Sequence, residues 1–239
     1  ARRYTYRLHA GTCVTQMTQW AADHAAMTHP LDYLVVLDFE ATCDDTNPPS
    51  PQEIIEFPSV LLSAHTLDVV AEFESFVRPT HHPVLTPFCT ELTGIHQGDV
   101  DGAPAFVDVF AAHQAWLLAH GLPRVPTQQG LPYAFVTCGD WDLKTMLPAQ
   151  LRAVGLDPHG VPLAYRRWIN IKHPFRATMK EKRGPAGMPH MLTKLGLSLE
   201  GRHHRGIDDC RNIARIARAL VAAGATLGLT AELPAVSPA

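Results

Sequence analysis

The sequence is poor in cysteine and has no long apolar segment. It contains 5 cysteines in 239 residues, an odd number, and none of them forms a Cys-x-x-Cys pair. This usage argues against a disulfide framework and a zinc ribbon, and it predicts an intracellular, reducing compartment such as the cytoplasm or nucleus. Arg2, Arg3 and Arg7 precede the first acidic residue, so organelle targeting stays open. No apolar run approaches the roughly 20 residues that a membrane-spanning helix needs, and we expect no membrane partner.

Charged residues are also scarce. They make up 18% of the chain, and the formal net charge of −3 gives no overall attraction to nucleic acid. A hydrophobic content of 46% and this length suit one globular domain with tails. We expect an N-terminal extension over residues 1–30 with a short helix over 17–27, a folded domain over 31–224, and a C-terminal tail over 225–239.

Several segments have the pattern of strands and helices. Five strands are predicted over residues 33–37, 54–63, 69–77, 133–138 and 168–171, the second and third joined as a hairpin. Helices are predicted over residues 88–95, 105–120, 188–195 and 207–223, and another after the fourth strand, ending near Pro148. A hairpin followed by alternating helices and strands predicts an α/β domain with a mixed sheet.

The first strand ends in two carboxylates. Side chains alternate along a strand, so Asp38 and Glu40 point the same way, with α-carbons about 6.6 Å apart. At an effective dielectric constant near 20, two such charges repel by roughly 2–3 kcal/mol. A divalent cation held by oxygen ligands, Mg²⁺ or Mn²⁺, would make this placement tolerable. The alternative is a solvent-exposed strand end or a carboxylate that caps a turn.

Further acids occur at two later positions. Asp142 follows the fourth strand, where open α/β sheets bind ligands, whereas Asp140 has the position of an N-cap. Asp209 lies four residues before Ile213 and therefore on the buried side of the last helix, where an unpaired acid is costly. Asp208 is better placed to interact with the helix N-terminus. His204 precedes Asp209 in a loop, where most histidines are exposed and have no catalytic role.

Taken together, these residues resemble a known family. Asp38-Phe39-Glu40, Asp142, and His204-x4-Asp209 resemble the three motifs of the DEDDh 3′–5′ exonucleases. Further similarity to the enhancer-of-RNAi-like exoribonucleases, which include the histone-mRNA 3′-exonuclease, and especially to their prion-protein-interacting branch, covers residues 33–222. It rests on VLDFEATC (36–43), QEIIEFP (52–58), PFCTELTGI (87–95), FVTCGDWDL (135–143) and GIDDCRNIARI (206–216).

The resemblance implies a ribonuclease-H-like exonuclease fold, with a central mixed five-stranded sheet flanked by helices. It implies that two Mg²⁺ ions, for which Mn²⁺ would substitute, are held by four acids, and that Glu40 and His204 are catalytic. The implied metal ligands are Asp38, Glu40, Asp142 and Asp209. The implied contacts to the terminal nucleotide are Glu40, Ala41, Thr42, Leu92, Thr93, Ile95, Trp141 and His204.

The implied activity is removal of nucleoside 5′-monophosphates from the 3′ end of RNA, single-stranded or overhanging. A basic segment over residues 166–183 would guide the strand. DNA is an alternative substrate, because only contacts to the 2′-hydroxyl separate the two. A catalytically silent RNA- or protein-binding module on the same fold is a further alternative, but all five motif residues are present. The sequence does not identify protein partners.

Overall fold

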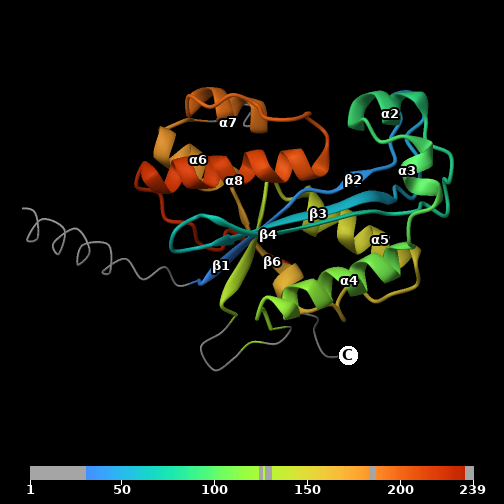
Figure 1. Ribbon diagram of the computed structural model, residues 1–239, viewed down its shortest axis with the longest axis horizontal. Coiled ribbons are helices and arrows are strands. Elements are labelled where there is room, and N and C mark those ends of the chain that lie inside the picture. Colours follow the sequence, from blue (N-terminus) through green and yellow to red (C-terminus); the bar gives the residue numbers. More distant parts are fainter. Residues whose placement is uncertain (1–30, 124–125, 127–130, 183–186, 235–239) are drawn as a thin grey trace, which may run out of the picture. The chain divides into compact units, whose positions relative to one another are not determined.

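The computed structural model describes residues 31–123, 126, 131–182 and 187–234. These residues form a sheet with helices packed on its two faces (Figure 1). The helix expected over residues 17–27 lies outside the described residues. No helix in the described part of the chain is long and apolar enough to cross a membrane.

The sheet is mixed and has seven strands. They are β1 (Tyr33–Leu37), β2 (Glu40–Ala41), β3 (Ile54–Ser63), β4 (Val69–Phe76), β5 (Tyr133–Thr137), β6 (Arg167–Asn170) and β7 (Ala231–Glu232). The order is β2-β3-β1-β5-β6-β7, with β4 paired to β3. β1 is parallel to β5 and β5 to β6, whereas β3 runs antiparallel to β1. The five predicted strands are the five longer ones, and β2 and β7 are too short to leave a sequence pattern.

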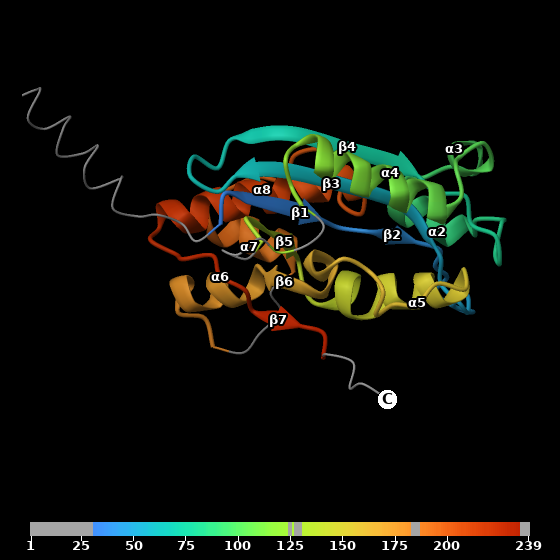
Figure 2. The same cartoon turned by 90° about the horizontal axis from the view of Figure 1, so that it is seen from below.

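Both faces of β1 are buried, which explains its unbroken apolar sequence. Leu34 and Val36 point toward a layer containing α6 (Lys172–Met179), α7 (Met188–Lys194) and α8 (Gly206–Ala222). Val35 and Leu37 point toward α4 (Phe106–Ala119) and α5 (Leu147–Ala153). Figure 1 shows the sheet between these two helical layers, and Figure 2 views the same arrangement from the side of α4 and α5. The apolar stripe of α8 faces the sheet as predicted, because Ile213, Ile216 and Leu220 are fully buried among these residues.

The remaining helices are short. They are α2 (Pro87–Thr93), α3 (Gln97–Asp101), η1 (Trp141–Met146) and η2 (Leu163–Arg166). The Thr86 hydroxyl caps α2 by accepting from the Cys89 N–H, and Gly94 ends α2 with φ +74°.

The helix after β5 continues past Pro148, contrary to our expectation that it would end there. Residues of η1 form a π-helical turn in which the Leu147 N–H donates to the carbonyl of Asp142. Pro148 then occupies the first turn of α5, where a missing N–H costs nothing, and the helix runs on to Ala153.

Residues after 224 pack on the domain rather than leaving it. Ala225 and Leu227 are buried in the core, and the Leu233 N–H donates to the carbonyl of Arg166 at 2.8 Å. β7 extends the sheet beside β6. The folded unit therefore continues beyond the boundary at 224 that we expected, at least to residue 234.

Candidate active site

The topology brings Asp38 and Asp142 to the same edge of the sheet. β1 and β5 are adjacent parallel strands, and each acid follows the carboxyl end of its strand. The backbone N–H of Phe39 donates to Asp142 Oδ1 at 2.9 Å, a buried bond that joins the two segments.

Helix α8 brings Asp209 to the same place. Carboxylate oxygens of Asp38, Glu40 and Asp209 all lie within 4.8 Å of one another, and Asp142 lines the same cavity. Glu40, Asp142 and Asp209 are each at most 8% exposed. Four acids from three separate segments of the chain therefore converge on one cavity.

Burial raises the pKa of each acid, and repulsion by other acids of the group adds to the rise for Asp38 and Glu40. Burial and then the charge of Asp142 raise the pKa of Asp38 well above its usual value. Burial and then the charge of Asp209 raise the pKa of Glu40 to about 9. Burial also raises the pKa of Asp142 to about 6, opposed by the bond from Phe39, and that of Asp209 to about 7.

The acids have the chemistry of a divalent cation site. Carboxylate oxygens are the ligands that Mg²⁺ and Mn²⁺ prefer, and cations would remove the repulsion that favours protonation. Asp209 Oδ1 is buried and has no hydrogen-bond partner among the described residues, although Oδ2 accepts from the His204 N–H. A buried acceptor without a donor is costly, and a bound cation would satisfy it.

A further buried acid, Glu56, holds the start of α8. Its carboxylate accepts from the N–H groups of Gly206 and Ile207 at 3.0 and 3.1 Å and from Arg205 Nε at 3.2 Å. Sequence reasoning did not identify this role, because Glu56 lies in the middle of β3, far from α8 in the chain. Gly206 makes the close approach possible, since a Cβ there would lie 2.8 Å from the Asp38 carbonyl oxygen.

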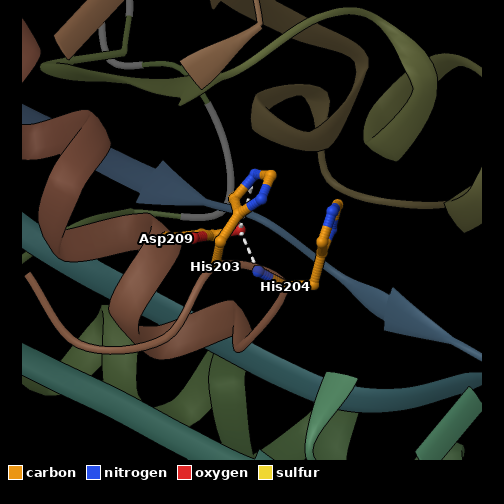
Figure 3. A group of neighbouring side chains, drawn as sticks. All are labelled: His203, His204 and Asp209. Carbon is orange, nitrogen blue, oxygen red and sulfur yellow. Dashed lines mark hydrogen bonds and ion pairs between the residues drawn. The ribbon is translucent and has the colours of Figure 1, made fainter. Parts of the chain in front are cut away.

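The loop before α8 carries His204 into the cavity. His204 has a left-handed backbone conformation, φ +66°, and its N–H donates to Asp209 Oδ2 at 3.0 Å (Figure 3). Burial, and then the charge of Arg202, lower the pKa of His204, which favours the neutral ring that can accept a proton. Arg202 itself donates to the Glu91 carbonyl and so links this loop to α2.

His203 also lines the cavity, which sequence reasoning missed. Its ring centroid lies 3.8 Å from that of His204. The sequence held the signal, two adjacent histidines, but only one of them matched the family motif.

The cavity has a volume of about 440 Å³. Of the residues predicted to contact a nucleotide, Glu40, Ala41, Leu92, Trp141 and His204 line it. Trp141 is 39% exposed and offers an aromatic face at the edge of the cavity. Lys172 is the one lysine or arginine among the described residues that line it.

Thr42, Thr93 and Ile95 do not line the cavity, and their contacts with a nucleotide stay a prediction. All three are at most 3% exposed. The Thr42 hydroxyl accepts from the Glu53 N–H, the Thr93 hydroxyl donates to the Cys89 carbonyl, and Ile95 packs in a small apolar cluster.

Asp140 occupies the N-cap position of η1, as expected, but its side chain makes no capping hydrogen bond. Its Oδ1 accepts from Trp168 Nε1 at 2.9 Å and from Asn170 Nδ2 at 3.0 Å, on the neighbouring strand β6. Asp208 accepts from the Arg202 N–H and from Arg211, so it orders the loop before α8 rather than facing the other acids.

The basic segment is dispersed in the structure. Arg166 donates to the carbonyl of Pro234, and Arg167 pairs with Glu232, so both hold the C-terminal strand. Lys172 begins α6 and lines the cavity. Among the described lysines and arginines of this segment, Lys172 is the one that lines the cavity with the acids.

The mixed sheet between two helical layers and the cavity lined by acids together define a nuclease of the ribonuclease-H-like type. A family model described as "Exonuclease" matches residues 35–217. The chain is 37% identical to the nuclease domain of 3′hExo, a DEDDh family member, in a structure bound to rAMP. The match has a TM-score of 0.78 and covers 87% of this chain and 99% of that one. The chain therefore belongs to the DEDDh family of exonucleases.

Curated relatives extend the comparison. The chain is 46% identical to human ERI1 exoribonuclease 3 over 200 residues, which are 80% of this chain and 54% of the relative. It is 38% identical to mouse 3′-5′ exoribonuclease 1 over 203 residues, 84% of this chain and 56% of the relative. The chain thus spans about half the length of these relatives. A solved structure titled for 3′-end recognition of the histone mRNA stem-loop by 3′-exonuclease has a TM-score of 0.79, at 33% identity, over 96% of this chain and 79% of that one.

Proposed function

We propose that the chain is a metal-dependent 3′–5′ exoribonuclease that releases nucleoside 5′-monophosphates from the 3′ ends of RNA. The observation that carries this proposal is the convergence of Asp38, Glu40, Asp142 and Asp209 on a cavity that also contains His204. The names of the relatives, exoribonuclease in each case, favour RNA over DNA.

The four acids would hold two divalent ions, Mg²⁺ with Mn²⁺ as a substitute, which would stabilise the charge that develops on the attacking and leaving oxygens. The unpartnered Asp209 Oδ1 supports this assignment. A Glu40 carboxylate oxygen lies within 4.8 Å of oxygens of Asp38 and Asp209, and we give Glu40 a catalytic as well as a ligand role, in line with the family motif.

His204 would be the general base. Its imidazole accepts a proton from a water molecule, whose oxygen forms a bond to the phosphorus of the last phosphodiester. The bond from phosphorus to the 3′-oxygen of the preceding nucleotide then breaks, and that oxygen takes up a proton. The products are a nucleoside 5′-monophosphate and a chain shortened by one nucleotide. The lowered pKa of His204 suits a proton acceptor near neutral pH.

The terminal nucleotide would lie against Leu92, Trp141 and the backbone of Ala41. Stacking of a base on an aromatic ring contributes about 1–3 kcal/mol and does not depend on which base it is. These walls therefore suit removal of any 3′ nucleotide. A single-stranded end or an overhang fits this arrangement, because a base must be unpaired to stack in this way.

The test uses RNA and DNA oligomers of the same sequence, each labelled at the 5′ end, with a free or a blocked 3′ end. With Mg²⁺ we expect stepwise shortening of the RNA from a free 3′ end, release of nucleoside 5′-monophosphates, and no reaction with a chelator. His204→Asn should abolish the reaction. Asn suits this position better than Ala, because it tolerates the left-handed backbone of His204.

His65→Asn is the matched control, because His65 is exposed and pairs with Asp32 outside the cavity. Shortening of DNA alone would make the chain a deoxyribonuclease of the same fold. If neither substrate reacts with Mg²⁺ or Mn²⁺, the catalytically silent binding module replaces the enzyme.

A further inference from the structure

The cavity contains a second kind of ligand set, with nitrogen atoms as well as oxygen. One ligand atom from each of His203, His204 and Asp209 lies within 4.8 Å of the other two. His203 Nε2 lies 4.0 Å from Asp209 Oδ2. Figure 3 shows both imidazoles extending in the same direction from the loop, with the Asp209 carboxylate beside them.

The donor atoms of this group are available for a ligand. Among the described residues, Asp209 Oδ1 has no hydrogen-bond partner although it is buried. Neither imidazole forms a hydrogen bond with another side chain in the described part of the chain. The His203 side chain is 34% exposed, so its ring can rotate. The group therefore combines a buried carboxylate oxygen that has no hydrogen-bond donor with two imidazoles that form no hydrogen bond to another side chain.

The donor types distinguish this group from the four acids. Mg²⁺ takes oxygen ligands and keeps several waters, whereas Zn²⁺ binds imidazole nitrogen readily and forms tetrahedral sites with three protein ligands and a water. Ligand atoms around one tetrahedral Zn²⁺ are about 3.4 Å apart. The three ligand atoms, which lie within 4.8 Å of one another, are already near that spacing.

We propose that His203, His204 and Asp209 form a Zn²⁺ site that overlaps the Mg²⁺ site and excludes its use. Zn²⁺ bound there occupies the imidazole of His204 and one carboxylate of the acid group. RNA hydrolysis then stops, because neither residue is free for its role with Mg²⁺. The inhibitory part of this proposal rests on the proposed function, and the binding part does not.

The binding test titrates the full chain with ZnSO₄ alone, without Mg²⁺ or RNA, by isothermal calorimetry. We expect His203→Gln to weaken the tightest Zn²⁺ site by about 10-fold or more, since even partners outside the first shell of ligands contribute 10- to 100-fold. His65→Gln is the control and should bind as the unsubstituted chain does, because His65 lies outside the cavity. Thermal unfolding verifies that each variant folds, and His203→Asn provides a second substitution.

Two more variants separate this site from its neighbours. Cys43 also lines the cavity and could bind Zn²⁺ through a thiolate, so Cys43→Ser should leave the affinity unchanged. Asp142→Asn should weaken binding less than His203→Gln does, because Asp142 lines the same cavity but is not in this group. Equal Zn²⁺ affinity of His203→Gln and the unsubstituted chain, or loss of the site in Cys43→Ser, overturns the proposal.

The activity test adds micromolar Zn²⁺ to RNA hydrolysis in millimolar Mg²⁺. The unsubstituted chain should lose activity, and His203→Gln should keep its activity at Zn²⁺ concentrations that inhibit the unsubstituted chain. Inhibition of both proteins at the same Zn²⁺ concentration overturns the inhibitory role. A chain without nuclease activity would contradict the proposed function, and the calorimetric result would still decide whether the Zn²⁺ site exists.

Discussion

The backbone N–H of Phe39 donates to the carboxylate of Asp142 at 2.9 Å, across 103 residues of sequence. Phe39 lies between Asp38 and Glu40, so this bond ties the acid of η1 to the two acids that follow β1. This bond also explains in part why the pKa of Asp142 rises less than that of Glu40, because the bond opposes the rise that burial causes for Asp142. One oxygen of Asp142 thus joins the two segments that carry the acids.

Asp142→Asn should abolish nuclease activity, whereas Asp140→Asn should retain most of it. Asn at 142 can still accept from the Phe39 N–H, so the fold is preserved while one anionic ligand is lost. We expect Asp142→Asn to lower the rate of RNA shortening at least about 100-fold. Even residues that only hydrogen-bond to a metal ligand contribute up to that factor. Rates of RNA shortening in Mg²⁺ measure both effects.

The two variants control for each other, because each removes one negative charge and the positions are two residues apart. Asp140→Asn should lower stability by about 1–2 kcal/mol, because bonds from Trp168 and Asn170 to a charged acceptor become bonds to a neutral one. Loss of activity in Asp140→Asn with retention in Asp142→Asn would reverse the assignment of the ligand.

Glu56→Gln should destabilise the domain and lower its activity. The carboxylate accepts from two backbone N–H groups at the start of α8 and from Arg205, and an amide cannot accept on its nitrogen. Removing one partner of a buried charge pair costs about 3–5 kcal/mol, and this substitution keeps part of the bonding, so we expect about 2–3 kcal/mol. Chemical denaturation gives the stability.

Glu74→Gln is the matched control for Glu56→Gln. Glu74 pairs with the other side of the same guanidinium, that of Arg205, and its side chain is 38% exposed. An exposed pair contributes about 0–1 kcal/mol, so this variant should be close to the unsubstituted chain in stability and activity. Equal effects of the two substitutions would mean that Glu56 does not hold the start of α8.

The sequence is sufficient to predict the parts of the fold that follow from local patterns. The apolar run of β1, the hairpin of β3 and β4, and the stripe of α8 are each visible within a few residues, and the structure confirms them. The gathering of the acids could be expected because β1 and β5 are strands whose carboxyl ends carry acids. The distances between the acids could not be predicted from the sequence.

Features that depend on contacts between distant segments could not be predicted. Asp140 has the position of a helix cap, but its bonds go to β6, whose register relative to β5 the sequence does not specify. Pro148 suggests a helix end, and only the π-helical turn before it allows the helix to continue. The role of Glu56 depends on α8 crossing β3, about 150 residues later.

Without metal, the stability of the domain should fall as the pH rises from 5 to 8. The folded state raises the pKa of Asp142 to about 6, of Asp209 to about 7 and of Glu40 to about 9, each above the value near 4 in the unfolded chain. Over this range these acids bind more protons in the folded state than in the unfolded chain, so their contribution to the free energy of unfolding decreases with pH. Buried His113, whose pKa is lowered to about 3, contributes in the opposite direction below about pH 6.5. At a pH where a group is protonated in the folded state and ionised in the unfolded chain, it lowers the free energy of unfolding by at most about 1.4 kcal/mol per pH unit.

Thermal unfolding in a chelator and in Mg²⁺ measures this effect. A change of 1 kcal/mol shifts the midpoint by about 2–4 °C for a domain of this size, so we expect a fall of several degrees in the chelator. Mg²⁺ should reduce the fall, because the cation replaces the protons. Asp38→Asn with Asp209→Asn should flatten the curve in the chelator. A midpoint that does not depend on pH in the chelator would show that the folded state does not raise the pKa values of these acids.

Lys172→Ala should lower kcat/KM for RNA and weaken its dependence on salt. Lys172 is the one lysine or arginine among the described residues lining the cavity, and its charge opposes the rise in the pKa of Asp142. An ammonium there can contact a phosphate of the strand, which the acids repel in the absence of cations. Loss of one such contact should lower kcat/KM by about 10-fold, or 1.4 kcal/mol, and reduce the slope of log(kcat/KM) against log[salt] by about 1. Lys144→Ala removes the same charge from an exposed position on η1 that does not line the cavity, and it should change neither quantity. Equal losses in the two variants would instead indicate a general effect of net charge on the approach of RNA.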